Sequence, residues 1–393
     1  MSRACFYPLT NVVKNYPWGS RHALNQRFNI LNPDDQPQAE LWMGVHPAGI
    51  SYVKNAQGRV ALSDLLASEP VSMLGEVTHK RFKDLPFLLK ILAAERALSI
   101  QVHPTKTQAE RGFARVQQLK DGEVPDYNDA NHKPELVYAI TPFVAMNGFR
   151  DAKTIAANLA ALDIPELKII ATSLLAQPDG EGLRTFFTAI MQLPPALKTQ
   201  AITQAVARGE ALYSEVTGGI FRRLQQHYPD DTGVLAPLFL NCITLQPGEA
   251  MFLYPGTLHA YVHGTAIEVM ASSDNVLRAG LTPKKINLDE LIQCTNFTPT
   301  AAASLRMLPE QHAAEARYPV PVEDFRFSIF TAVDNQMIMT SSAEIVLVIE
   351  GAATLSHASG ESLLLHVGQS AFIPASTGQW LLTTTGKVGR VSC

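Results

Sequence analysis

The sequence has no closely spaced cysteine pair, no long apolar run and no excess of basic charge. Its four cysteines, Cys5, Cys242, Cys294 and Cys393, lie far apart and form no CxxC motif. We therefore expect free thiols in a reducing cytoplasm. The 32 basic residues are outnumbered by 36 acidic ones, which gives a net charge of −4 and argues against a nucleic-acid partner.

Membrane association is also not expected. Residues 1–10 lack the apolar core of a signal peptide. The most hydrophobic stretch, 85–100, is interrupted by Lys90, Glu95 and Arg96, whereas a membrane-spanning helix needs about 20 apolar residues. With 46% hydrophobic and 17% charged residues, the composition instead predicts well-formed cores in a cytoplasmic protein.

The 393 residues suggest two or three domains at roughly 100–200 residues each, and the texture changes twice along the chain. Residues 1–149 and 236–393 carry short apolar runs broken by turn residues, which predicts β-sheet. Between 150 and 235, apolar residues recur at helical spacing, as in Val216, Ile220 and Leu224. Turn residues interrupt this helical pattern at 177–180, 194–195 and 229–233.

One pattern occurs twice in the sheet-rich part. Residues 245–253 (LQPGEAMFL) and 365–373 (LHVGQSAFI) both read L-x-x-G-[EQ]-[AS]-x-F-[LI], which predicts a tight turn between two strands. Because such units are common in cupin or jelly-roll barrels, we predict two barrels. His259 stands eleven residues after the first glycine and Gln379 eleven after the second. We therefore expect one metal site, in the first barrel, and a structural second barrel.

Four side chains from three distant stretches offer metal ligands. Gln101 and His103 would face the same side of one strand, because side chains alternate along a strand. Glu135 begins another apolar run, and His259 follows a turn. Two imidazole nitrogens and two oxygens suit zinc, although manganese or iron would also fit. Lys133 would share a face with Glu135 and could carry a proton there.

The motifs that surround these residues resemble those of the type I mannose-6-phosphate isomerases, a cupin family. The resemblance covers about residues 11–290 and continues more faintly to the end. Its most specific run is 273–284, which lies beside the Gln-x-His strand. The matching segments are 15–19 (NYPWG), 39–44 (AELWMG), 101–104 (QVHP), 131–135 (NHKPE), 255–261 (PGTLHAY) and 273–284 (SDNVLRAGLTPK).

The resemblance implies a mainly β fold with an α-helical insertion, built from two cupin barrels and a helical domain. The catalytic cupin domain would comprise residues 1–149 and 236–295. The helical domain, 150–235, would interrupt it, and a cupin-like structural domain, 296–393, would follow.

The resemblance also implies the activity, which is interconversion of mannose 6-phosphate and fructose 6-phosphate by proton transfer through an enediol. One zinc ion per chain would be bound, and Arg278 would be needed for turnover. The zinc ligands would be Gln101, His103, Glu135 and His259. The polar groups around the substrate would be His132, Lys133, Glu268 and Asp274, and further pocket residues would be Trp18, Glu40 and Tyr261.

Several roles stay open at this point. Arg278 stays protonated, so it suits oxyanion stabilisation or phosphate binding rather than proton abstraction. Lys133 or Glu268 could move the proton between the two carbons, and His132 or Asp274 could help to open the sugar ring.

Two other classes of protein compete with the isomerase. An iron-dependent cupin dioxygenase would be expected to show His-x-His where this strand reads Gln-x-His. A non-enzymatic sugar-phosphate-binding cupin would need an output domain, and no such sequence is evident. The sequence leaves the oligomeric state open, and a monomer is compatible with it.

Overall fold

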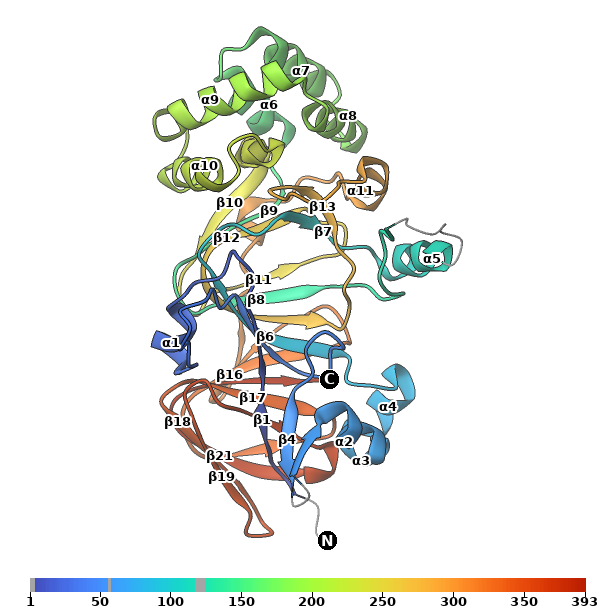
Figure 1. The fold of residues 1–393 in the computed structure, drawn as a ribbon, viewed down its shortest axis with the longest axis vertical. Coiled ribbons are helices and arrows are strands. Elements are labelled where there is room, and N and C mark those ends of the chain that lie inside the picture. Colours follow the sequence, from blue (N-terminus) through green and yellow to red (C-terminus); the bar gives the residue numbers. More distant parts are fainter. Residues whose placement is uncertain (1–3, 56–57, 117–123) are drawn as a thin grey trace.

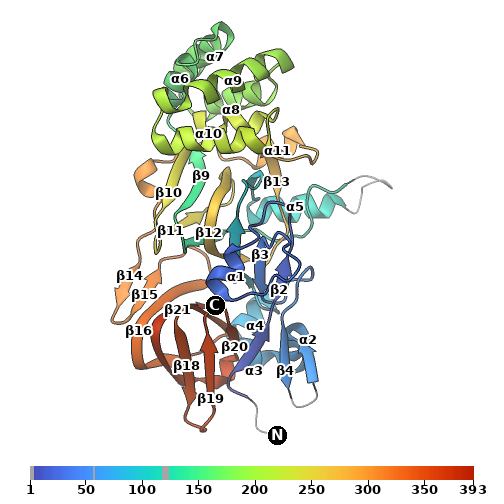
Figure 2. The ribbon, with the colours of Figure 1, turned by 60° about the vertical axis from the view of Figure 1, so that its left-hand side comes forward.

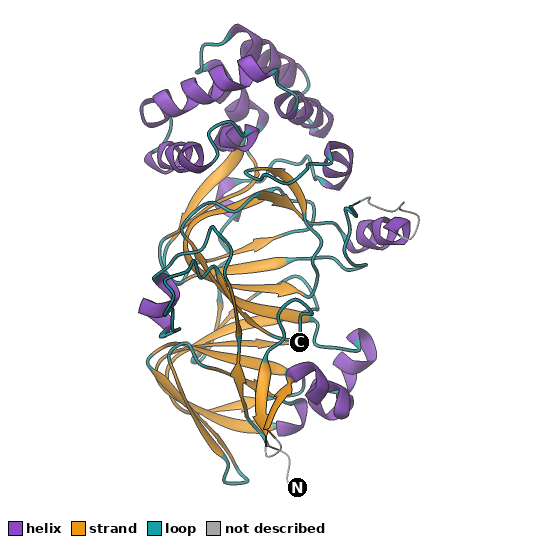
Figure 3. Cartoon of the chain, in the orientation of Figure 1, coloured by secondary structure: helices purple, strands orange, loops and turns teal. Residues whose placement is uncertain are grey.

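The computed structural model describes residues 4–55, 58–116 and 124–393. Along the long axis of the molecule, a block of helices lies at one end, a ten-stranded sheet in the middle and an eleven-stranded sheet at the other end (Figure 1). Smaller helices flank the two sheets, and the helical block covers one end of the middle sheet (Figure 3).

The middle sheet has the order β10-β9-β12-β6-β3-β2, and β7, β8, β11 and β13 join it off this path. Neighbouring strands are antiparallel. The strands are β2 (Val12–Lys14), β3 (Glu40–Met43), β6 (Phe87–Ala94), β7 (Ile100–Val102), β8 (Glu135–Ala139), β9 (Phe143–Phe149), β10 (Leu240–Leu245), β11 (Ala250–Leu253), β12 (His259–Ala271) and β13 (Leu277–Gly280).

Strand β12 changes partners in its middle. Its first part pairs with β9, and from Gly264 onward it pairs with β6 and β8. A register shift between Tyr261 and His263 precedes Gly264, whose φ is +120°. A Cβ on Gly264 would lie 2.6 Å from the carbonyl oxygen of Pro142, so only glycine fits this crossing. The crossing allows one strand to contribute side chains from both of its parts to one site.

The two faces of the middle sheet have different neighbours. Strand β6 is buried at every residue, and its Leu89 and Ile91 pack in a core cluster with Phe327 and Ile345 of the eleven-stranded sheet. This core joins the two sheets. Lys90 lies between Leu89 and Ile91 and points to the opposite face, because side chains alternate along a strand.

The helical block confirms the predicted helices and their breaks. Asp179 accepts hydrogen bonds from the backbone N–H groups of Glu181 and Gly182 at a helix start, and Pro195 occupies the first turn of the next helix. Phe186 shares a core cluster with Leu258 and Leu277, so the block packs on the strands that carry the site. Its elements are α6 (Ala152–Ala160), α7 (Pro165–Ala176), α8 (Gly180–Met191), α9 (Pro195–Leu212), α10 (Glu215–His227) and the 3-10 helix η1 (Thr232–Leu238).

The eleven-stranded sheet has the order β14-β15-β16-β21-β17-β20-β1-β4-β5, with β18 and β19 off this path. Figure 2 shows its C-terminal strands below the middle sheet. Its strands are β1 (Tyr7–Thr10), β4 (Tyr52–Asn55), β5 (Gly58–Ala61), β14 (Glu310–His312), β15 (Glu315–Tyr318), β16 (Arg326–Met339), β17 (Glu344–Glu350), β18 (Ala352–His357), β19 (Ser362–His366), β20 (Ser370–Ile373) and β21 (Gln379–Ser392).

The remaining helices lie outside the helical block. None of the described helices is both long and apolar enough to span a membrane, and the hydrophobic stretch 85–100 contains strand β6 and ends at the first residue of β7. These helices are α1 (Ala23–Phe28), α2 (Leu62–Ser68), α3 (Pro70–Leu74), α4 (Glu76–Phe82), α5 (Lys106–Val116), α11 (Leu288–Cys294), and the 3-10 helices η2 (Ala302–Ser304) and η3 (Ala375–Thr377).

The repeated pattern forms two similar turns. Gly248 and Gly368 have φ values of +92° and +80°, and His259 and Gln379 are the first residues of the long strands β12 and β21. The strands on either side of each turn pair with other strands: β10 pairs with β9 and β11 with β8, while β19 pairs with β18 and β20 with β17. The pairing of the described strands does not close either sheet into a ring. The mainly β fold with a helical insertion is therefore confirmed, and the two closed barrels are not.

Candidate metal and substrate site

Three of the four predicted metal ligands meet in the interior. His103 follows β7, Glu135 begins β8 and His259 begins β12, and all three are buried. One ligand atom from each lies within 4.8 Å of the others. The Nε2 atoms of His103 and His259 are 3.2 and 3.6 Å from the two carboxylate oxygens of Glu135.

The backbone fixes which imidazole nitrogen faces this cluster. Nδ1 of His103 donates to the carbonyl oxygen of Asn275 at 2.7 Å, and Nδ1 of His259 donates to that of Thr257 at 2.9 Å. Each Nε2 therefore presents a lone pair to the centre of the cluster. Burial lowers the pKa of both imidazoles, that of His259 to about 4, so both are neutral near pH 7.

The cluster has the spacing of a tetrahedral metal site. Two ligands about 2.0–2.1 Å from a tetrahedral zinc lie about 3.3 Å apart, and the two distances above are close to this value. Nε2 of His103 is buried and has no hydrogen-bond partner among the described residues, despite its closeness to Glu135. A buried acceptor without a donor is costly, and a cation would satisfy it. The residues therefore fit a divalent metal ion.

Gln101 lies beside this cluster. It pairs across the sheet with His259 on one side and with Arg278 on the other, and its side-chain amide donates to the hydroxyl of Ser99 at 3.2 Å. The register therefore brings Arg278 to the strand next to two predicted ligands. Both Gln101 and Arg278 are half-buried.

Glu135 accepts contacts from two further predicted residues. Nζ of Lys133 lies 3.1 Å from Oε1, and the hydroxyl of Tyr261 donates to Oε2 at 3.1 Å. Burial alone would raise the pKa of Glu135, but the charge of Lys133 holds it well below its ordinary value, and the imidazoles add to this effect when they are protonated. Burial and the neighbouring carboxylates raise the pKa of Tyr261, which stays a hydroxyl donor.

Glu268 forms a buried ion pair with Lys90, which sequence reasoning missed as a site residue. The distance from Nζ to Oε2 is 2.8 Å, and the two residues lie opposite each other on β6 and β12. Burial opposes the charge on Lys90, yet the attraction of Glu268 and Glu40 raises the pKa of Lys90. A single lysine inside the apolar run FLLKILAA was the signal that could have identified it.

The indole ring of Trp42 lies next to this ion pair. The Trp42 ring centroid is 5.1 Å from Nζ of Lys90, and its indole N–H donates to the carboxylate of Glu40. Trp18 stacks on Tyr16 with their ring centroids 6.0 Å apart. The predicted pocket residue Glu40 is thus held by Trp42, and Trp18 is held against Tyr16.

The two candidates for ring opening are held differently. Nε2 of His132 lies 3.1 Å from both carboxylate oxygens of Asp324, in the C-terminal part of the chain, and not in the metal cluster. Oδ1 of Asp274 lies 3.2 Å from Nε2 of His46. The hydrogen bond from His46 lowers the pKa of Asp274, and the charges of Lys133 and Lys90 add to this effect.

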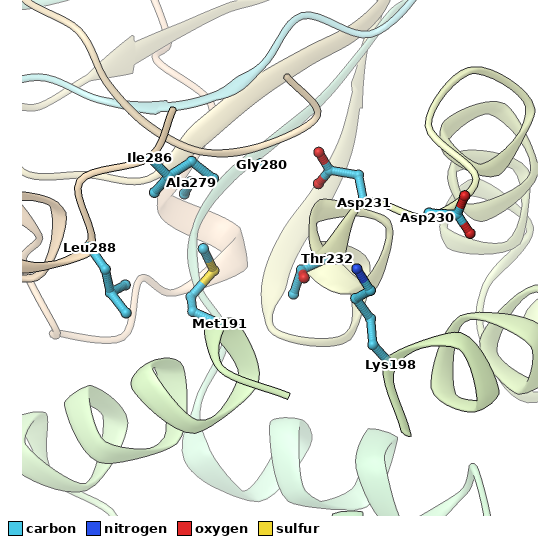
Figure 4. Close-up of a pocket in the computed structure, with 9 residues that line it drawn as sticks. All are labelled: Met191, Lys198, Asp230, Asp231, Thr232, Ala279, Gly280, Ile286 and Leu288. Atoms are coloured by element: carbon cyan, nitrogen blue, oxygen red, sulfur yellow. The ribbon is translucent and has the colours of Figure 1, made fainter. Parts of the chain in front are cut away.

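A pocket of about 330 Å³ lies between the helical block and β13 (Figure 4). It is lined by Ala279 and Gly280, which directly follow Arg278, and by Lys198, Asp231 and neighbouring side chains. None of the predicted site residues lines it, so this pocket is separate from the metal cluster.

Comparisons with known proteins agree with this geometry. The model of the type I phosphomannose isomerase catalytic domain matches residues 6–152, and that of the mannose-6-phosphate isomerase cupin domain matches 314–393. The chain is 43% identical to mannose-6-phosphate isomerase of Escherichia coli, over 98% of both chains. It is 32% identical to that of Homo sapiens, over 97% of this chain and 96% of the human protein.

Solved structures give the same result. A mutant of phosphomannose isomerase from Salmonella typhimurium superposes with a TM-score of 0.93 at 41% identity, covering 99% of each chain. On these grounds, the chain belongs to the type I mannose-6-phosphate isomerase family.

Proposed function

We infer that this chain is an aldose–ketose isomerase that interconverts mannose 6-phosphate and fructose 6-phosphate. The observation that carries the inference is the buried cluster of His103, Glu135 and His259, beside the ion pair of Lys90 and Glu268. Relatives of the same length and fold are named for this activity. An iron dioxygenase is not favoured, because β7 carries Gln101 where a second histidine would be expected.

We propose zinc as the ion, one per chain, with Gln101 completing the ligand set. A bound zinc would supply a Lewis acid that polarises a sugar oxygen as negative charge develops on it. Arg278, on the strand next to Gln101, would add a fixed positive charge for that oxygen or for the phosphate.

Glu268 is our candidate for moving the proton between carbon 2 and carbon 1. Burial raises its pKa, and the carboxylates of Glu135 and Glu40 add to this effect, while Lys90 limits the rise. A base with a raised pKa takes and returns a proton more readily near neutral pH. Lys133 is the alternative, although its ammonium group is engaged by Glu135.

The remaining site residues would serve the substrate. Asp274 is half-exposed and is electrostatically coupled to the lysines of the site, which suits a role in ring opening. His132 contacts Asp324 and would take part in ring opening only if that contact were broken. Trp18, Glu40 and Tyr261 would line the pocket.

Three broader expectations stay predictions. The first is the division into a catalytic domain (1–149 and 236–295), a helical domain (150–235) and a C-terminal cupin-like domain (296–393). The second is that each cupin part is a barrel. The third is a monomeric, cytoplasmic protein without a nucleic-acid partner. Each of the four cysteines, all in the described part of the chain, is unpaired, as expected for a reducing compartment.

The test is a coupled assay for fructose 6-phosphate formed from mannose 6-phosphate, on protein whose metal content has been measured. A chelator should abolish turnover, and zinc should restore it. In D2O, proton transfer through an enediol should place deuterium on the product. Glu268→Gln should lose this exchange while it keeps its metal, and Lys133→Met should lose it instead if lysine is the base. Absence of turnover in metal-loaded parent protein would refute the isomerase.

A further inference from the structure

His46 lies just beyond β3 and is held in one tautomer. Its side chain is only 4% exposed. Nδ1 accepts a hydrogen bond from the backbone N–H of Ala48 at 3.2 Å, so Nδ1 carries a lone pair in the neutral ring. The proton is therefore on Nε2, which points at Oδ1 of Asp274 at 3.2 Å.

The backbone of Asp274 is anchored independently of its side chain. Its N–H donates to Oδ2 of Asp129 at 2.7 Å, and the hydroxyl of Ser273 donates to Oδ1 of the same carboxylate at 2.9 Å. The adjacent Asn275 accepts the hydrogen bond from the metal-site residue His103. The main chain of Asp274 is thus fixed next to the metal cluster, and what stays free is the rotation of its carboxylate.

That carboxylate has one restrained oxygen. The side chain of Asp274 is 54% exposed. Its Oδ1 atom is held by the imidazole of His46. The ring of Trp42 packs edge-on against His46, with ring centroids 5.0 Å apart, and the Trp42 indole donates to Glu40. Gly49 leaves room for Trp42, because a Cβ there would lie 2.7 Å from the ring. The packed segment 40–49 therefore orients two carboxylates, those of Glu40 and Asp274.

We propose that His46 is a positioning residue for Asp274: its Nε2–H fixes one carboxylate oxygen, so that the other is aimed to accept a hydroxyl of the sugar phosphate. The proposal rests on the isomerase function. It assigns to the buried imidazole a role in substrate handling that acts through Asp274, without contact between His46 and the substrate.

A pair of substitutions separates this role from packing. In His46→Asn the amide reaches only to the position of Nδ1, so it can accept from Ala48 but cannot reach Asp274. In His46→Gln the longer side chain places an amide N–H near the position of Nε2. Loss of a hydrogen bond to a charged group should lower kcat/KM of His46→Asn by about 10- to 100-fold. His46→Gln should recover most of it, and His366→Asn, at an exposed histidine, should match the parent.

A double-mutant cycle then identifies the route of the effect. In an Asp274→Ala background, His46→Asn should cost no further activity, because the group that His46 positions is gone. Equal losses with and without Asp274, or full activity of His46→Asn, would overturn the proposal. Metal content and thermal unfolding of each variant show whether it is folded.

The tautomer gives a readout that does not depend on turnover. Nitrogen-15 NMR of labelled histidines should show His46 neutral with its proton on Nε2, and Asp274→Ala should shift that resonance. A proton on Nδ1 would overturn the proposal even if the parent enzyme is active. An inactive parent with the expected tautomer would instead refute the proposed function and leave the His46–Asp274 hydrogen bond established.

Discussion

Replacing Lys90 by methionine should strongly destabilise the middle sheet. Nζ of Lys90 lies 2.8 Å from Oε2 of Glu268, and the two side chains are only 7% and 5% exposed. Methionine keeps most of the length and apolar volume but leaves the carboxylate buried without its partner. Removing one member of a buried ion pair costs about 3–5 kcal/mol, and we expect a loss in this range.

The loss should depend on pH in one direction. Without Lys90, the folded-state pKa of Glu268 rises further above the unfolded value of about 4.3. A carboxyl group with a raised folded-state pKa destabilises the fold at pH values above its unfolded pKa, because the unfolded chain releases the proton more easily. The free energy of unfolding should therefore fall, relative to the parent, by up to about 1.4 kcal/mol per pH unit until the folded-state pKa is reached.

Urea unfolding followed by circular dichroism, at about pH 5 and about pH 8, measures this loss. The double variant Lys90→Met with Glu268→Gln should recover much of the stability, since neither position of the former pair then carries an unpaired charge. Lys387→Met is the matched control, because Lys387 forms an ion pair of the same length with Glu350 at the surface and should cost at most about 1 kcal/mol. A Lys90→Met loss no larger than this control, or one independent of pH, would refute the reasoning.

Four further outcomes are expected. His259→Ala should lose both metal, measured by elemental analysis, and turnover; an active, metal-free variant would contradict the metal site. Arg278→Ala should keep its metal and fold but lose about 100- to 1000-fold in kcat, as for removal of an oxyanion-stabilising group. Gln379→Ala, at the exposed start of β21, should change turnover less than about twofold; a large loss with the fold intact would contradict a structural role for the C-terminal part. Asp151→Ala removes the cap that Thr154 donates to at the start of α6 and should cost about 1 kcal/mol. Because the hydrogen bonds from Thr154 lower the pKa of Asp151, this difference should be present above about pH 4 and vanish as pH falls through the folded-state pKa; a difference that persists in acid would argue against the cap.

Local sequence signals predicted the features that local physics determines. Asp179 marks a helix start because its side chain accepts hydrogen bonds from free N–H groups of the first turn. Pro195 marks one because proline has no N–H group that would need a partner there. Alternation along a short strand predicted that Gln101 and His103 share one side; the structure brings His103 to His259 and pairs Gln101 with His259 across the sheet, and a shared ligand face stays a prediction. The two glycine turns were predicted for the same reason, since their positive φ values suit glycine.

Long-range pairing was beyond such signals. Lys90 and Glu268 are 178 residues apart, and their contact depends on the register of β6 against β12. The turn at Gly248 was predicted, but the partners of its flanking strands, β9 and β8, are set by tertiary packing. The contact of His132 with Asp324 likewise joins two parts of the fold that no local pattern relates.

The partner change in β12 links the parts of the site that this strand supplies. One continuous strand carries His259, Tyr261 and Glu268, so a slip of one residue in its register would turn all three side chains away together. Amide hydrogen exchange on either side of Gly264 should show whether the two parts of this strand open together.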